Sequence, residues 1–391
     1  MFVIFLTGCE NKIPVSNASL AQDNLNSAII QFDHLLDSAL KLDHIPKTVN
    51  NLGETKYCSQ DFDWTEGFFP GMCWQLYNYS GNKKYEDAAI YFQGKFADHR
   101  FLTTNHDLGF VFNNSFGGAY RATNDLESKQ VLIDAANGLI GRYNPTVGSL
   151  QSWNVDKGWQ AHRGWRFPVI IDNMMNLELL FEVSKITGDS KYKDIAIGHA
   201  NTTLKNHLRP DFSSYHVVDY DPDRGNVRSR ETAQGFAHES SWARGQAWGL
   251  YGFTMCYRYT KDERYLHAAE KIAAFILNNK SLPADKIPYW DYNAPKIPDE
   301  PRDASAAAIT ASALIELNSY SKINYLDRAV EILGNLSSEK YKAEAGSNNN
   351  FILKHSVGSI PHGAELDVPL IYADYYYMEA LMRLNKLKKP V

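Results

Sequence analysis

A phrase of about ten residues that recurs along the chain constrains the fold more than any other feature. Copies lie at residues 80–89, 187–196 and 260–269, with a weaker copy at 321–329 and a degenerate one beginning at 122–125. In each copy a glycine or small polar residue closes one helix, an Asn or Asp caps the next, and alanines allow close packing. The phrase predicts helical hairpins.

Apolar residues at helical spacing predict about twelve helices, whereas convincing strand patterns are scarce. Hairpins that each expose one apolar side must stack, either as an open solenoid or as a closed ring. The copies are irregularly spaced, with long inserts near 143–168 and 208–240, which favours the ring. We therefore predict an all-α protein, an (α/α)6 barrel with long loops at one end. The predicted helices lie near 20–40, 67–79, 84–99, 108–120, 125–142, 169–186, 190–207, 241–259, 263–279, 303–320, 325–337 and 371–386.

The first nine residues form an apolar run that ends in Leu-Thr-Gly-Cys and resembles a bacterial lipoprotein signal with lipidation at Cys9. The run lacks Lys and Arg and has about half the usual length. After Cys9 no stretch reaches the roughly 18 apolar residues of a membrane span. The expected organisation is a signal and tether over 1–19 and a single catalytic domain over 20–391, exported to the periplasm and anchored to a membrane, such as the outer membrane, only through a lipid on Cys9.

Composition narrows the class of partner. Lys and Arg total 40 against 45 Asp and Glu, a net charge of −5, whereas nucleic-acid binders carry a basic excess or stripe. Aromatic residues reach 13%, including 8 Trp. Several Trp lie near polar side chains in the inserts, and sugars are held by aromatic faces combined with a few polar groups. The composition therefore favours a sugar ligand and argues against a nucleic acid.

Two acidic residues lie at predicted helix starts. Asp107 follows His106, and the sequence alone leaves open whether it is a helix cap or a functional group. Asp172 follows three branched apolar residues and precedes two Met. Such surroundings should raise its pKa, so that it can hold a proton near neutrality as a general acid must.

A third cluster, at 234–248, alternates Trp242, Arg244, Gln246 and Trp248 on the way into a helix. Arg244 has no acidic residue nearby at helical spacing, and its planar guanidinium group is well shaped to bind a carboxylate. We expect Trp248 to pack inside the ring. The inserts before this cluster add polar and aromatic side chains, namely Trp153, Trp159, His162, Trp165, Arg166 and His216.

Other chemistries lack their motifs. The chain has no GxSxG, HExxH, P-loop or strand-linked GxGxxG pattern. His106 and Asp107 lack further ligands at a familiar metal-binding spacing. We expect no metal and no cofactor.

Five motifs occur in order over about residues 20–386: His-Asp at 106–107, IDNMMN at 171–176, WARGQAW at 242–248, RDASAA at 302–307 and IYADYYY at 371–377. Together they resemble glycoside hydrolase family 88, the unsaturated glucuronyl hydrolases. The resemblance implies an (α/α)6 barrel and an exo-acting enzyme, monomeric or homodimeric, whose substrates are unsaturated di- or tetrasaccharides left by polysaccharide lyases.

The resemblance also implies roles for single residues. Asp172 is expected to be the general acid and base, and Asp107 the second essential carboxylate. Expected around the substrate are His216, Gln234, Arg244, His106, Trp64, Trp165 and Trp242. One departure concerns residues 359–364, which keep a Ser but lack the Lys that helps some members bind a sulfated second sugar. Preference for sulfated substrates therefore stays open.

The expected reaction is hydration of the C4–C5 double bond, with Asp107 holding water or raising the proton affinity of Asp172 through its like charge. Two alternatives remain. One is an unsaturated rhamnogalacturonyl hydrolase with the same chemistry on pectin fragments, against which WARGQAW favours the glucuronyl group. The other is a catalytically inactive, lipid-anchored sugar-binding protein, which would not need both Asp107 and Asp172.

Overall fold

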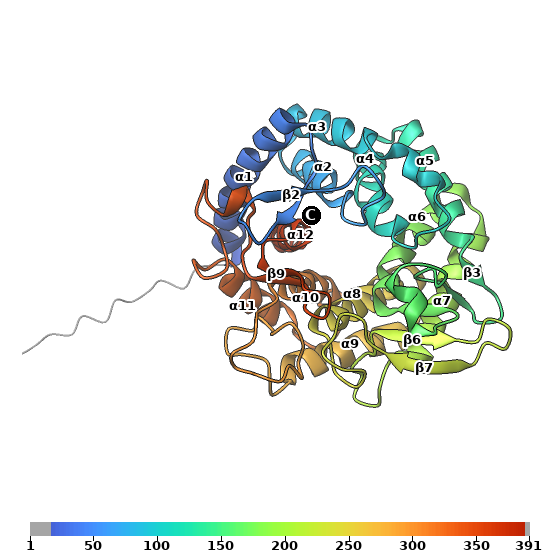
Figure 1. Cartoon of the computed structure of the whole chain (residues 1–391). Helices are drawn as coiled ribbons and strands as arrows, with labels where there is room; N and C mark the ends of the chain where they lie inside the picture. The colour runs from blue at the N-terminus through green and yellow to red at the C-terminus, as the bar shows by residue number, and fades with distance from the viewer. Residues whose placement is uncertain (1–16, 388–391) are drawn as a thin grey trace, which may run out of the picture.

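The computed structural model describes residues 17–387, in which twelve α-helices form two concentric rings (Figure 1). The outer ring consists of α1 (Asn17–Leu42), α3 (Lys83–Gly94), α5 (Leu126–Ile140), α7 (Ser190–Asn206), α9 (Glu263–Asn278) and α11 (Leu326–Leu336). The inner ring consists of α2 (Phe68–Ser80), α4 (Phe116–Thr123), α6 (Leu177–Thr187), α8 (Ala243–Thr260), α10 (Ala304–Leu317) and α12 (Ile371–Lys386). The predicted (α/α)6 barrel is confirmed.

The recurring phrase forms the short turns from each inner helix to the next outer helix. Gly81 ends α2 in the left-handed region at φ 68°, and Asn82 then caps α3 by accepting the backbone N–H of Lys84. Asp189 and Asp262 cap α7 and α9 in the same way. The predicted hairpin corners are therefore present.

A tyrosine in four of the copies ties neighbouring outer helices together. Its ring is buried, and its hydroxyl bonds to the preceding outer helix. The pairs are Tyr85 with Asp33 of α1, Tyr192 with Asn137 of α5, Tyr265 with Asn201 of α7, and Tyr325 with the backbone carbonyl of Glu270 of α9. The repeated tyrosines are thus structural.

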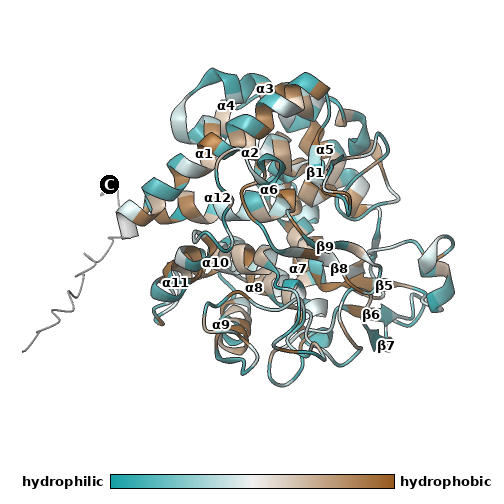
Figure 2. Cartoon of the chain, turned by 60° about the vertical axis from the view of Figure 1, so that its left-hand side comes forward, coloured by the Kyte–Doolittle hydropathy of each residue, from teal (hydrophilic) through white to brown (hydrophobic). Residues whose placement is uncertain are grey.

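The connections from outer to inner helices are long and lie together at the other end of the barrel. They carry all the strands of the described residues: β1 (Pro46–Val49), β2 (Thr55–Tyr57), β3 (Tyr143–Asn144), β4 (Ser149–Leu150), β5 (Pro168–Ile170), β6 (Val217–Tyr220), β7 (Val227–Glu231), β8 (Ser356–Ser359) and β9 (Ala364–Val368). Figure 2 shows β5 to β9 on the side away from the end of α12. An antiparallel sheet β5-β6-β7 joins the two inserts noted in the sequence.

Two predicted helices begin differently from expectation. The segment expected at 169–186 starts as strand β5, continues as the 3-10 helix η4 (Ile171–Asn176), and only then becomes α6. The β-branched Val169 and Ile170 pair with β6, because such side chains suit a strand. The segment expected at 108–120 starts as the π-helical turn η2 (Gly109–Asn113) before α4. Gly109 permits a close approach here, since a Cβ on it would lie 2.4 Å from Cα of Asn176.

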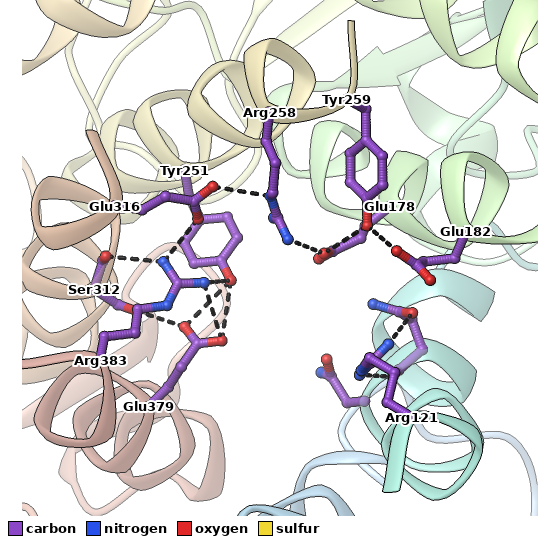
Figure 3. Close-up of polar contacts among 12 residues, drawn as sticks. Arg121, Glu178, Glu182, Tyr251, Arg258, Tyr259, Ser312, Glu316, Glu379 and Arg383 are labelled. Carbon is purple, nitrogen blue, oxygen red and sulfur yellow. Dashed lines mark hydrogen bonds and ion pairs between the residues drawn. The ribbon is translucent and has the colours of Figure 1, made fainter. Parts of the chain in front are cut away.

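Ion pairs below the site hold four elements of the inner ring together (Figure 3). Arg258 of α8 lies 2.9 Å from Glu178 of α6 and 2.9 Å from Glu316 of α10. Arg383 of α12 lies 2.9 Å from Glu316 and 3.3 Å from Glu379 of its own helix. These contacts fix the relative positions of helices whose other ends carry the candidate site.

One cluster of buried apolar residues runs from Ala21 to Leu384. No helix within residues 17–387 combines the length and the apolar character that a membrane crossing requires. Cys9 and most of the predicted tether lie outside the described residues.

Candidate active site

The predicted site residues meet where the inner helices begin and the long connections gather. Asp172 lies on η4, Asp107 lies just before η2, His216 precedes β6, and Trp242 and Arg244 open α8. Helix N-termini carry partial positive charge, so their convergence favours an anionic ligand. The barrel thus brings together residues as far apart in the sequence as Asp107 and Arg244, which are separated by 137 positions.

Asp172 is a buried carboxyl with only 9% of its surface exposed. Burial raises its pKa to about 7, although the charge of Arg244 and a hydrogen bond from the Trp248 side chain act in the opposite direction. Its Oδ2 has no hydrogen-bond partner within the described chain. A carboxyl in this state holds a proton near neutrality and has a free oxygen to exchange it, so the predicted rise in pKa is confirmed.

His216 presents a fixed face to Asp172. Its Nδ1 accepts the backbone N–H groups of Ala233 and Gln234, both at 3.1 Å, and therefore carries no proton. Burial and the charge of Arg244 hold the pKa of His216 well below its usual value, so the ring is neutral. The proton of the neutral ring must lie on Nε2, which is 3.7 Å from Asp172 Oδ2. His216 thus turns a neutral N–H group toward the carboxyl without forming a hydrogen bond to it.

Asp107 is the second carboxyl of the site, and 15% of its side chain is exposed. Burial and the nearby charge of Asp172 raise its pKa to about 7, while a hydrogen bond from Asn176 opposes the rise. The two carboxyls thus repel each other as like charges, and burial is the largest cause of the raised pKa of each. His106 is neutral, since burial lowers its pKa, and its Nε2 lies 3.3 Å from Asp107 Oδ1.

Asn176 positions Asp107, a function that sequence reasoning missed. Its Nδ2 donates to Asp107 Oδ1 at 3.3 Å, and its Oδ1 accepts the backbone N–H of Phe110 at 3.0 Å. The sequence did contain a clue. Asn176 follows Asp172 by four residues in the same motif, so its side-chain amide is expected about one helical turn from the carboxyl of Asp172.

Arg244 differs from the sequence interpretation, which found no acidic partner for it. Asp303, the N-cap of α10, lies 3.2 Å from Nη1, and the carbonyl of Gly358 accepts Nη2 at 2.6 Å. A second carbonyl, that of Val357, also accepts Nη1. The partners come from distant segments, so helical spacing was the wrong test. Arg244 anchors β8 and places its charge near Asp172.

Gln234 helps to hold the same strand. Its Nε2 donates to the carbonyl of Gly358 at 3.3 Å, and its backbone N–H binds His216. Gln234 therefore lies at the site as predicted, with its amide bound to the protein.

Aromatic rings form the walls of the site. Trp242 lies 4.6 Å from the ring of His216, and Trp64 lies 4.9 Å from that of Tyr372. Trp165 stacks on Trp153 at 5.7 Å and 20°. Flat rings next to polar groups suit a pyranose. Trp248, expected only to pack inside the ring, also reaches Asp172.

A cavity of about 640 Å³ opens beside Asp107 and is lined by Trp64, His106, Asp107, Trp153 and Lys157 among others. This volume falls within the range of about 300–1,000 Å³ for small-ligand sites. Within residues 17–387 no group of three or more His, Cys, Asp or Glu side chains is arranged to hold a metal ion.

The family model for glycosyl hydrolase family 88 matches residues 43–385. The chain belongs to this family. It is therefore a glycoside hydrolase. The family 88 motifs at 106–107, 171–176 and 242–248 carry Asp107, Asp172 and Arg244, and the first of these motifs lines the cavity described above.

Named relatives agree with this family 88 assignment. An unsaturated glucuronyl hydrolase of Formosa agariphila is 45% identical over 91% of this chain and 88% of its own length. The crystal structure of an unsaturated glucuronyl hydrolase specific for heparin superimposes with a TM-score of 0.89 at 45% identity, covering 95% of this chain and 98% of the other. A mutant enzyme from Streptococcus agalactiae, complexed with dGlcA-GalNAc6S, gives 0.80 at 29% identity over 97% and 94%.

The buried carboxyl of Asp172 predicts a stability cost that grows with pH. In the unfolded chain it ionises near the ordinary aspartate pKa of 3.8, whereas in the fold its pKa is about 7. The folded state therefore binds more protons between these values, and stability falls as pH rises through that window. We expect Asp172→Asn to raise the free energy of unfolding by about 4 kcal/mol near pH 8 and by less than about 1 kcal/mol near pH 4.

Urea unfolding at the two pH values measures this difference. Asp156→Asn, at an exposed carboxylate of the same side of the barrel, is the matched control and should change stability little at either pH. A gain from Asp172→Asn that did not depend on pH would contradict the raised pKa.

Proposed function

We propose that this family 88 hydrolase removes the 4,5-unsaturated uronic acid from the non-reducing end of lyase-generated oligosaccharides, specifically fragments of glycosaminoglycans. The observation that carries the proposal is the protonatable carboxyl of Asp172, whose free Oδ2 lies beside the neutral N–H of His216. Relatives named for unsaturated glucuronyl and unsaturated chondroitin disaccharide hydrolysis support the choice of substrate.

The substrate dictates the chemistry. Its C4–C5 double bond is attached to the ring oxygen, so the sugar is a vinyl ether that is protonated at carbon. Asp172 gives its proton to C4, and positive charge develops at C5 and the ring oxygen. The carboxylate of Asp172 then takes a proton from a water molecule as the water oxygen bonds to C5. The resulting hemiketal opens to a C5 ketone, and the C1–oxygen bond breaks to release the remaining sugar.

The surrounding groups support these steps. His216 Nε2–H faces the Asp172 carboxylate once its proton has left, and so stabilises that charge. Asp107, held by Asn176, accepts a hydrogen bond from the attacking water. The inner-helix N-termini and the charge of Arg244 favour the uronate carboxylate, while Trp64 and Trp242 provide apolar faces for the ring.

Replacing the acid tests this mechanism. Asp172→Asn keeps the shape of the side chain but removes its exchangeable acid proton, so we expect kcat to fall at least about 1,000-fold. Loss of the ultraviolet absorbance of an unsaturated disaccharide measures the rate. In water labelled with oxygen-18, a brief reaction of the native enzyme should place the label on C5 of the product, as detected by NMR. Label on C1 instead would exclude hydration and indicate ordinary displacement at C1.

Substrate preference tests the choice of polysaccharide. We expect unsaturated disaccharides from chondroitin or heparin to lose their absorbance with native enzyme, and unsaturated rhamnogalacturonan fragments to be consumed at least about 100 times more slowly in kcat/KM. That ratio corresponds to about 2.7 kcal/mol of transition-state binding. The reverse order would assign the enzyme to pectin breakdown, and binding without turnover of any substrate would identify a sugar-binding protein.

We further propose that the enzyme acts in the periplasm as a lipoprotein anchored at Cys9. The Leu-Thr-Gly-Cys pattern at residues 6–9 supports this proposal. Expressed from its full chain in a Gram-negative host, the native protein should incorporate labelled palmitate and sediment with membranes. Cys9→Ser should do neither and should keep its specific activity. Equal labelling of both proteins would refute the anchor.

A further inference from the structure

A second cavity lies inside the barrel, toward the end away from the candidate active site. Its volume is about 410 Å³, which lies within the range for small-ligand sites. Its outer part is lined by Tyr79, Arg121, Tyr259 and Lys386, which lie in the last turns of α2, α4, α8 and α12. We call this space the far cavity.

The inner end of the far cavity reaches the two helical turns next to the candidate carboxyls. Gly109 of η2 lines it, two residues after Asp107. Met175 of η4 also lines it, three residues after Asp172. The two turns touch, because Gly109 packs directly against Asn176. A ligand in the far cavity would therefore contact the elements that position both carboxyls without meeting the substrate.

The charged side chains around the far cavity balance one another (Figure 3). Arg258 and Arg383 are paired with glutamates, as described above. Tyr259 donates its hydroxyl to Glu182, and its oxygen lies 3.4 Å from Glu178 Oε1. The lining has four cationic side chains, Arg121, Arg258, Arg383 and Lys386, against the acidic Glu178, Glu182 and Glu379, with Glu316 in contact with two of the arginines. The cavity therefore carries no net charge and does not call for an ionic ligand.

Neutral amides form another part of the wall. Tyr375 donates its hydroxyl to Asn114 Oδ1 at 3.2 Å and receives a hydrogen bond from the side chain of Gln75. The other amide atoms, Gln75 Oε1 and Asn114 Nδ2, are buried and have no hydrogen-bond partner within residues 17–387. One is an acceptor and the other a donor, and a hydroxyl group can serve both. The far cavity thus offers a hydroxylated ligand two hydrogen bonds that the described chain leaves unmade.

We propose that the far cavity binds a neutral mono- or disaccharide and that the bound sugar lowers kcat through η2 and η4. Uncharged sugars are held by walls without net charge, by free amide atoms and by aromatic faces. The rings of Trp74, Tyr79 and Tyr251 belong to the same lining. Binding at this site goes beyond the proposed function, whereas the effect on kcat rests on it.

The link to catalysis is geometric. The hydrogen bond from Asn176 to Asp107 is already long at 3.3 Å. A ligand that displaces Gly109 also displaces Asn176, because the two residues are in direct contact, and the hold on Asp107 then weakens. Such a ligand acts from behind the carboxyls, so it should lower kcat and leave KM unchanged.

Calorimetry tests the binding without any turnover. N-acetylgalactosamine, a neutral sugar, should bind the native full chain with a Kd of about 1 mM or lower. Asn78 is an exposed residue of the lining, and Asn78→Trp should weaken the binding at least about 10-fold, because the indole fills space that the sugar needs. Gln75→Leu should weaken it about 3- to 10-fold by removing the free acceptor.

Lys185→Trp is the matched control, because Lys185 is exposed in the last turn of α6 and does not line the far cavity. Its Kd should equal that of the native protein. Galactosamine and galacturonate are the charged probes, and both should bind at least about 10-fold more weakly than N-acetylgalactosamine, because the balanced wall has no spare counter-charge for them. Added salt should leave the Kd of the neutral sugar unchanged.

Kinetics test the link through η2 and η4. With an unsaturated disaccharide as substrate, saturating N-acetylgalactosamine should lower kcat of the native enzyme at least about fivefold and leave KM unchanged. The kcat of Asn78→Trp should not respond to the same sugar concentration.

Two calorimetric results would overturn the site: native protein that binds no neutral sugar, or equal losses of affinity in Lys185→Trp and Asn78→Trp. Tighter binding of either charged probe would refute the neutral ligand. A rise in KM in place of the fall in kcat would put the sugar in the catalytic cavity, and binding with an unchanged kcat would refute the link through η2 and η4. Failure of the proposed function is distinguishable, because the calorimetric results involve no turnover.

Discussion

Closure of the helical ring is the constraint on which the rest of the structure depends. Each outer helix is joined to the next inner helix by a long connection, and each inner helix to the next outer helix by a short turn. All inner helices therefore begin at the same end of the barrel. The long connections, with all described strands, gather at that end. Partial positive charge, polar side chains and loops therefore collect on one face, while ion pairs of Arg258 and Arg383 lock the inner helices below it. The site is a consequence of how the ring closes.

Burial is what makes the carboxyls useful. Asp107 and Asp172 both have pKa values of about 7 because the walls of Trp, Phe and Tyr exclude water from them. A carboxyl in water would be ionised at neutral pH and unable to protonate carbon. Burial also destabilises the folded state once the carboxyls ionise, because the unfolded chain exposes the same charged groups to water. Neutral Asn176 binds Asp107 and neutral His216 faces Asp172, so neither neighbour brings a charge to the carboxyls.

Much of this architecture was predictable because it is local. The caps Asn82, Asp189 and Asp262 act on backbone groups two residues away, so the phrase that contains them predicts the hairpins directly. The apolar neighbours of Asp172 in the sequence likewise indicated its raised pKa. The starts of two helices were not predictable in this way. Pairing of β5 with a strand almost fifty residues later and the approach of Gly109 to Asn176 override the helical pattern.

The sequence by itself determined the hairpins, the ring, the family and the two carboxyls, since these follow from short spacings and from motifs read in order. Only the tertiary structure decided the partners. It paired Arg244 with Asp303, turned Nε2 of His216 toward Asp172 and attached Asn176 to Asp107. Each of these relations joins segments that lie far apart in the sequence, and they meet only because the ring closes.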